Sequence, residues 1–195
     1  MDFFQSVISR KRLMFAGLAG LLMCAASTAH AAPPDQLKGK SIVINWTETR
    51  QQRDERPDGG GWTDFKTVNA RHLLNIYVST AGRVFSRQTN TTGQGSGSVD
   101  QVAGERGGAF PTRTPSFSGR TMTIVAETRG GARRTVVEFD AGFASCSART
   151  ATAFQEGQSS VSLSPISKRK VEIKSVTASG ASCSVQSGNV LGGPS

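Results

Sequence analysis

Two five-residue segments of this chain are nearly identical, ASCSA at residues 144–148 and ASCSV at residues 181–185. Each centres on a cysteine, Cys146 or Cys183, and residues 32–195 contain no other cysteine. Paired cysteines in an oxidising compartment are normally crosslinked, so the sequence predicts a disulfide between these two residues. Closing the loop between them is worth about 4 kcal/mol in the chain-entropy account. A redox-active pair is the weaker alternative, because the close C-x-x-C spacing typical of such pairs is absent.

The N-terminal residues follow the pattern of a secretory signal peptide. Basic residues at 10–12 precede an apolar stretch at 13–26, and Ala29-His30-Ala31 forms a small-residue cleavage site. We therefore expect residues 1–31 to be removed and the mature protein to be periplasmic or secreted. The apolar stretch is shorter than the roughly 20 residues that span a bilayer, so no transmembrane span is expected in the mature chain.

The remaining 164 residues suit a single domain covering 32–195. Gly, Ser and Thr are abundant, and no long stretch has the apolar spacing of an amphipathic helix. These features favour an all-β protein, an antiparallel meander of about eight strands that forms a small barrel. A two-sheet sandwich is the alternative architecture.

Alternation of apolar and polar residues predicts the strands. In residues 41–48, Ile42, Ile44 and Trp46 share one face. Two hairpins are expected, one from 73–79 and 83–89 around Gly82, and one from 122–126 and 137–141. The other predicted strands are 144–154, 160–163, 170–177 and 182–186.

Two stretches are expected to lie outside strands. Residues 50–61 are polar and glycine-rich, which is typical of an exposed connection. Residues 90–119 contain seven glycines and two prolines and predict a long, flexible Gly/Ser-rich loop.

The mature chain is basic. Without residues 1–31, which carry three basic residues and one acid, 20 basic and 13 acidic residues remain, a net charge of +7. This balance favours anionic partners, either a polysaccharide or a lipid headgroup. Nucleic acid is not expected as a partner, because the leader directs the chain out of the cytoplasm. Another exported protein is a further alternative.

Several basic residues are clustered at predicted turns and strand ends. If these ends gather on one rim, they form an anion-binding face; otherwise they are a solvated edge that discourages aggregation. The candidate anion-binding residues are Arg129, Arg133, Arg134, Lys168, Arg169 and Lys170.

No pattern in the sequence predicts catalysis, a metal site or a cofactor. His72 is the only histidine in the mature chain and is expected to be a surface or half-buried residue. A hidden carboxylate pair is the remaining catalytic possibility, with Glu127 and Glu138 the best candidates because they flank the 130–131 turn. The other carboxylates considered are Glu48, Asp140 and Glu172.

The segments LKGKSIVINWTETR at 37–50 and SCSVQSGNVLGG at 182–193 are similar to those of small exported hypothetical proteins of Gram-negative bacteria. The resemblance spans most of the mature chain and implies no known activity, cofactor or site. The expected function is therefore non-catalytic binding of an anionic envelope component. A polysaccharide hydrolase is one alternative, and an inhibitor-like module using the 90–119 loop is another.

Overall fold

The computed structural model describes residues 32–102, 115–128, 131–154, 159–164 and 166–192. Residues 1–31, which we expect to be a signal peptide, and residues 103–114 of the expected loop lie outside the described residues. The described chain is all β apart from one short 3-10 helix, η1 (Asp35–Leu37), and its strands form two antiparallel sheets. The all-β antiparallel prediction is confirmed. Among the described residues, no helix is long and apolar enough to cross a membrane.

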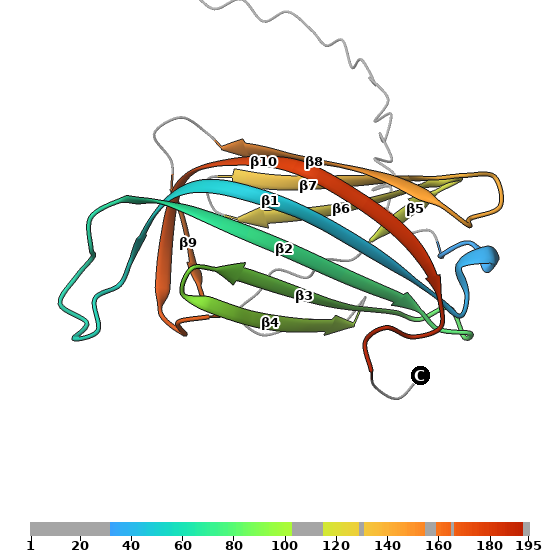
Figure 1. The fold of residues 1–195 in the computed structure, drawn as a ribbon, viewed down its shortest axis with the longest axis horizontal. Helices are drawn as coiled ribbons and strands as arrows, with labels where there is room; N and C mark the ends of the chain where they lie inside the picture. The colour runs from blue at the N-terminus through green and yellow to red at the C-terminus, as the bar shows by residue number, and fades with distance from the viewer. Residues whose placement is uncertain (1–31, 103–114, 129–130, 155–158, 165, 193–195) are drawn as a thin grey trace, which may run out of the picture.

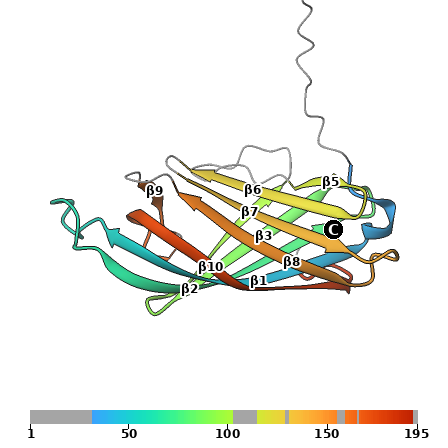
Figure 2. The same ribbon diagram turned by 90° about the horizontal axis from the view of Figure 1, so that it is seen from above.

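The larger sheet is strongly curled into a half-barrel (Figures 1 and 2), and its strand order is β4-β3-β2-β1-β10-β9. Its strands are β1 (Lys40–Asp54), β2 (Lys66–Val78), β3 (Val84–Thr92), β4 (Gly95–Val102), β9 (Ser160–Leu163) and β10 (Lys170–Ser187). The smaller sheet has the order β5-β6-β7-β8 and faces the curled sheet. Its strands are β5 (Ser116–Ser118), β6 (Thr121–Thr128), β7 (Gly131–Phe139) and β8 (Cys146–Phe154).

Alternation explains the strands that the sequence predicted. Ile42, Ile44 and Trp46 on β1 are all buried, and their neighbours Asn45 and Thr47 are exposed. The β2–β3 and β6–β7 hairpins form as expected. In the first, Gly82 has φ +80°, a left-handed conformation that glycine adopts without a steric cost.

Three sequence expectations are wrong. The polar residues 50–54 continue β1 rather than starting a loop, because all five pair with β10 and residues 50–52 also pair with β2. The predicted strands 170–177 and 182–186 are one strand, β10, with a bulge at Gly180, whose φ is +64°. The 90–119 stretch contains β4 and β5, and β4 pairs with β3 along its full length.

The predicted Cys146–Cys183 disulfide is present, and it joins the two sheets. Its Cα atoms are 5.5 Å apart, and it links the start of β8 to the far half of β10. Thr152 on β8 donates a 2.8 Å hydrogen bond to the carbonyl of Val176 on β10. The two links show that β8 and β10 lie side by side in opposite directions, although the described residues contain no backbone ladder between them. A disulfide and a side-chain hydrogen bond therefore close this seam of the half-barrel.

The apolar core fills one end of the half-barrel. It is built from inward residues of both sheets, including Leu37, Ile76, Met122, Val137 and Phe139, and the disulfide packs against it. At the other end β1 finishes and β7 and β10 begin, and the inward residues there include the polar Glu48 and Gln52 as well as the apolar Val171. We call this the cationic end and define it as residues 48–66, 131–134 and 164–174.

Candidate functional site

The interior changes from apolar to polar along β1. After Ile42, Ile44 and Trp46, the same face continues with Glu48, which is 3% exposed. His72 on β2 and Gln88 on β3 are buried beside it. Buried polar side chains are costly unless they have partners, so this cluster has a defined arrangement.

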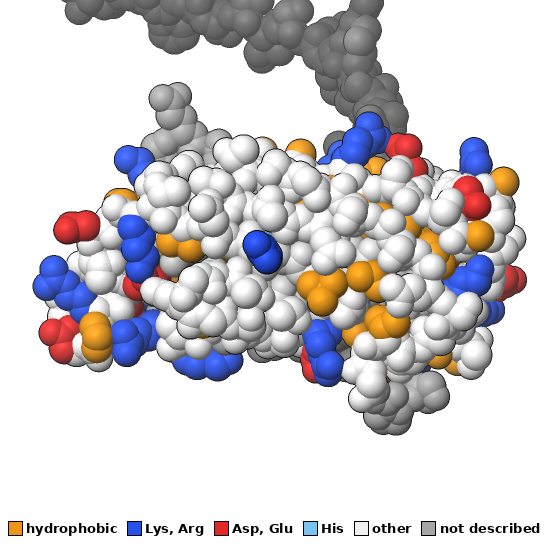
Figure 3. Space-filling view, in the orientation of Figure 1, with side chains coloured by type: hydrophobic (Ala, Val, Ile, Leu, Met, Phe, Trp, Pro, Cys, Tyr) orange, Lys and Arg blue, Asp and Glu red, His pale blue; other side chains and the backbone are white. Residues whose placement is uncertain are grey.

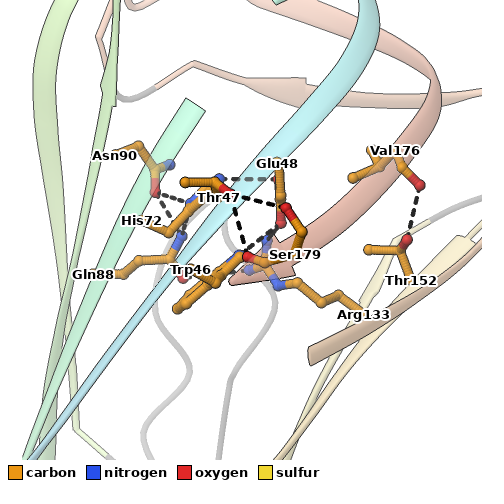
Figure 4. A network of polar contacts seen from close by, with 10 residues as sticks. All are labelled: Trp46, Thr47, Glu48, His72, Gln88, Asn90, Arg133, Thr152, Val176 and Ser179. Atoms are coloured by element: carbon orange, nitrogen blue, oxygen red, sulfur yellow. Dashed lines mark hydrogen bonds and ion pairs between the residues drawn. The ribbon is translucent and has the colours of Figure 1, made fainter. Parts of the chain in front are cut away.

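Glu48 is the centre of the cluster (Figure 4). Its Oε1 accepts hydrogen bonds from Arg133 Nη1 at 2.7 Å and from Trp46 Nε1 at 3.0 Å. Its Oε2 lies 2.9 Å from His72 Nε2. The Arg133 guanidinium also lies over the Trp46 ring, 5.0 Å from the ring centroid. The His72 ring stacks on the same Trp46 ring, with the two ring centroids 4.8 Å apart. One carboxylate therefore connects β1, β2 and β7.

A second set of contacts holds His72 from the β3 side. Its Nδ1 lies 2.7 Å from Asn90 Oδ1 and 3.3 Å from Gln88 Nε2. Gln88 Nε2 donates a 2.7 Å hydrogen bond to Asn90 Oδ1. These contacts hold the imidazole ring through Nδ1, while its Nε2 lies close to Glu48 Oε2 but forms no hydrogen bond in the described part of the chain.

Burial and charge shift the pKa values of this cluster. Burial acts to raise the pKa of Glu48, but contacts with His72, Arg133 and Trp46 outweigh it and hold the pKa well below its usual value. Burial lowers the pKa of His72 and outweighs the opposing contact with Glu48. The cluster therefore contains a carboxylate and a histidine that resists protonation.

Between the two sheets, little free space adjoins the side chains of the cluster. A hollow lined by Trp46, Gln88, Arg133 and Thr135 has a volume of about 10 Å³, which is about the space that one water molecule needs. The cluster is packed between the sheets. Its geometry suits a structural ion pair better than a substrate site.

Glu127 and Glu138 are not close together. In the β6–β7 register Glu127 pairs with Ala132 and Glu138 pairs with Thr121, at opposite ends of the hairpin. At about 3.4 Å per residue, they are roughly 20 Å apart along the strands, whereas paired glycosidase carboxylates are about 5–9.5 Å apart. The expectation that they approach each other across the hairpin is wrong.

The other carboxylates considered have protein partners. Glu138 pairs with Arg149 at 2.5 Å, and Glu172 pairs with Arg53 at 2.5 Å. Asp140 accepts hydrogen bonds from the backbone N–H groups of residues 144 and 145. In the part of the chain that the structure describes, no group of three or more His, Cys, Asp and Glu side chains could hold a metal ion.

The structure separates the predicted anion-binding residues into two kinds. Arg133 is not on an outer rim, because its side chain points inward to Glu48 and is only 16% exposed. Arg129 lies outside the described residues. Arg134, Lys168 and Arg169 are exposed and form no ion pair with described residues, while Lys170 lies 3.4 Å from Glu55.

The exposed candidates are brought to the same end of the molecule. The backbone N–H of Glu55 bonds to the carbonyl of Lys170, which joins the end of β1 to the start of β10. Arg134 lies near the start of β7, where its neighbour Arg133 reaches Glu48. The described residues of the cationic end carry ten basic and six acidic side chains, so its net charge is positive.

The buried polar residues could have been found by extending the alternation. Glu48, Arg50 and Gln52 continue the face of Trp46, and His72 continues the face of Leu74. Treating 41–48 as a complete strand hid this pattern. The contact between Glu48 and Arg133 gives no local signal, because 85 residues separate the two.

No family model matches this chain, and neither a curated protein nor a solved structure matches it. The resemblance to small exported proteins therefore remains an expectation from the sequence.

Proposed function

We propose that this protein is exported and is a non-catalytic binding protein for an anionic component of the cell envelope, which it holds at its cationic end. The observation that carries the proposal is the exposure of Arg134, Lys168 and Arg169 at one end, without ion pairs to described residues. Cations that are free of internal partners remain available to an external anion.

The buried charges support the same sign of potential. Two cations, Arg50 and Arg133, point into this end, and Glu48 is the carboxylate that faces them. The lowered pKa of His72 keeps that residue neutral at pH 7. The Nε atom of Arg50 is buried and has no hydrogen-bond partner in the described part of the chain. The interior cations therefore add to the field of the exposed ones.

The β9–β10 turn holds its cations in place. Ser164 N–H bonds to the carbonyl of Arg169 at 2.8 Å, and Lys168 N–H bonds to the carbonyl of Ser164 at 3.0 Å. Lys168 has φ +57°, a left-handed conformation that is uncommon for a lysine. A preformed turn loses less conformational freedom when it binds a ligand.

Two observations support export. The leader pattern predicts secretion, and the disulfide is a bond that persists in oxidising compartments. A polysaccharide hydrolase has less support, because Glu127 and Glu138 are far apart and Glu48 lies in a packed ion-pair cluster.

The test is the binding of the mature protein to dextran sulfate, with uncharged dextran as the matched polymer. We expect the triple variant Arg134→Gln, Lys168→Asn, Arg169→Gln to bind dextran sulfate at least tenfold more weakly; asparagine is chosen at 168 because it tolerates a left-handed backbone. The control is Arg149→Gln, which removes an exposed arginine that is paired with Glu138. Equal losses in the triple variant and the control would overturn the proposed location.

A further inference from the structure

The outer face of the curled sheet has a hollow of about 460 Å³ over β1, β2 and β3. Thr47 and Thr49 of β1, Asn69 and Arg71 of β2 and Thr91 of β3 line it, and all five are exposed. Because side chains alternate along a strand, these residues lie on the opposite face of the sheet from Glu48 and His72. The volume is within the roughly 300–1,000 Å³ range of small-molecule sites.

The side chains of the hollow are mainly neutral hydrogen-bonding groups. Thr49 Oγ1 donates a 2.9 Å hydrogen bond to Asn69 Oδ1, and Thr91 Oγ1 lies 2.8 Å from Ser96 Oγ. Thr47 Oγ1 lies 3.0 Å from Ser179 Oγ. In Figure 3 the area around a Lys or Arg side chain near the centre of this face is largely white, and hydrophobic side chains gather to the right of it.

Arg71 is the charged residue at the centre of this arrangement. In the sheet register it pairs with Thr47 on one side and with Thr91 on the other. Its guanidinium has no hydrogen bond or ion pair with any described residue, although it lies among potential acceptors. A planar guanidinium is suited to bind a carboxylate through two parallel hydrogen bonds.

We propose that this hollow binds an acidic saccharide, with a uronate carboxylate on Arg71 and sugar hydroxyls on the threonine and asparagine side chains. Neighbouring strands are about 4.8 Å apart, so Thr47 on β1 and Thr91 on β3 are each one strand spacing from Arg71, a separation comparable to the width of a sugar ring. A neutral sugar would satisfy the hydroxyls and leave the arginine without its counterion. The site is distinct from the cationic end and does not rest on the function proposed for it.

The experiment compares two trisaccharides by calorimetric titration of the mature protein. The probe is a linear trigalacturonate, and its control is the same trisaccharide with the carboxylates reduced to alcohols. We expect the trigalacturonate to bind at least tenfold more tightly than the reduced form. We also expect Arg71→Gln to remove that difference and Thr49→Val to weaken binding several-fold. Urea unfolding of each variant would confirm that the fold is intact.

Two further variants separate this site from the cationic end. Arg149→Gln and the triple variant at 134, 168 and 169 should bind trigalacturonate as the unmodified protein does. The inference is overturned if trigalacturonate does not bind at millimolar concentration, if it binds no more tightly than its reduced form, or if Arg71→Gln has no effect. It is also overturned if the triple variant alone abolishes binding, because the carboxylates would then sit at the cationic end.

Discussion

The Glu48 carboxylate on β1 accepts a 2.7 Å hydrogen bond from Arg133 on β7, and this buried ion pair bridges the two sheets. Glu48 is 3% exposed and Arg133 is 16% exposed. A buried pair of this kind contributes little compared with an apolar pair of the same size, but removing one member leaves the other charge without a partner.

Arg133→Gln is therefore expected to lower the free energy of unfolding by about 3 kcal/mol. Urea denaturation measures it, with Arg134→Gln as the control. Arg134 is the next residue but is exposed, so its replacement should change stability by no more than about 0.5 kcal/mol. The double variant Glu48→Gln, Arg133→Gln should lose less than the sum of the single losses, because the two residues interact directly. Additive losses would show that the pair is not coupled.

Stability should fall as the pH is lowered from 7 to 5, and His72 should account for this fall. Burial lowers the pKa of His72 in the folded protein, so the unfolded chain binds a proton first, near pH 6.5. The proton uptake of the unfolded state destabilises the fold as the pH decreases. Glu48, whose pKa is also lowered by its contacts, adds a further loss below about pH 4.5.

Urea midpoints of a protein of residues 32–195, measured between pH 7 and 5, would show the effect. His72 is the only histidine in residues 32–195, so the slope between pH 7 and 5 should be reduced in His72→Gln, whatever the stability of that variant at pH 7. An unchanged slope would mean that His72 titrates in the folded protein as it does in the unfolded chain.

Removal of the disulfide should be strongly destabilising. The Cys146–Cys183 bond closes a sequence separation of 37 residues and holds a seam that has no described backbone ladder. The double variant Cys146→Ala, Cys183→Ala should lose about 4 kcal/mol. The matching measurement is urea unfolding of the unmodified protein with and without reductant. A reductant effect well below 1 kcal/mol would contradict the role of the bond at the seam.

The bulge in β10 should depend on glycine at position 180. Gly180 has φ +64°, and a Cβ built there would meet Thr47 Oγ1 at 3.8 Å, an ordinary contact. The expected loss for Gly180→Ala, about 1–2 kcal/mol, therefore comes from the left-handed backbone and not from a clash. Gly142→Ala is the control, since its Cβ would meet no atom and its φ is not positive. Equal melting temperatures for the two variants would contradict this account.

The sequence was a good guide wherever a strand has an apolar face. The alternation of Ile42, Ile44 and Trp46 identified part of β1, and the repeated cysteine segment identified the disulfide. The same reasoning failed for β4, whose sequence GSGSVDQV has a low strand propensity. β4 forms by pairing with β3, including a 2.8 Å contact between Thr89 Oγ1 and Ser98 Oγ.

The candidate sites were harder to predict because they depend on contacts between sheets or across strands. The sequence did not distinguish the two adjacent arginines at 133 and 134. In the structure, Arg133 points inward to Glu48 and Arg134 is exposed. The outer hollow joins residues of three strands, and only the strand register places Thr91 beside Arg71. Neither arrangement has a signature within a single segment of sequence.

The most direct test of the central claim is the salt dependence of dextran sulfate binding by the disulfide-bonded protein of residues 32–195. Exposed charges are screened over about 8 Å at physiological ionic strength, so binding through Arg134, Lys168 and Arg169 should weaken steeply with added salt. We predict at least a tenfold loss of affinity between about 50 and 300 mM NaCl, with no measurable binding to uncharged dextran. Affinity that is unaffected by salt, or equal binding to the two polymers, would contradict an anion-binding function for the cationic end.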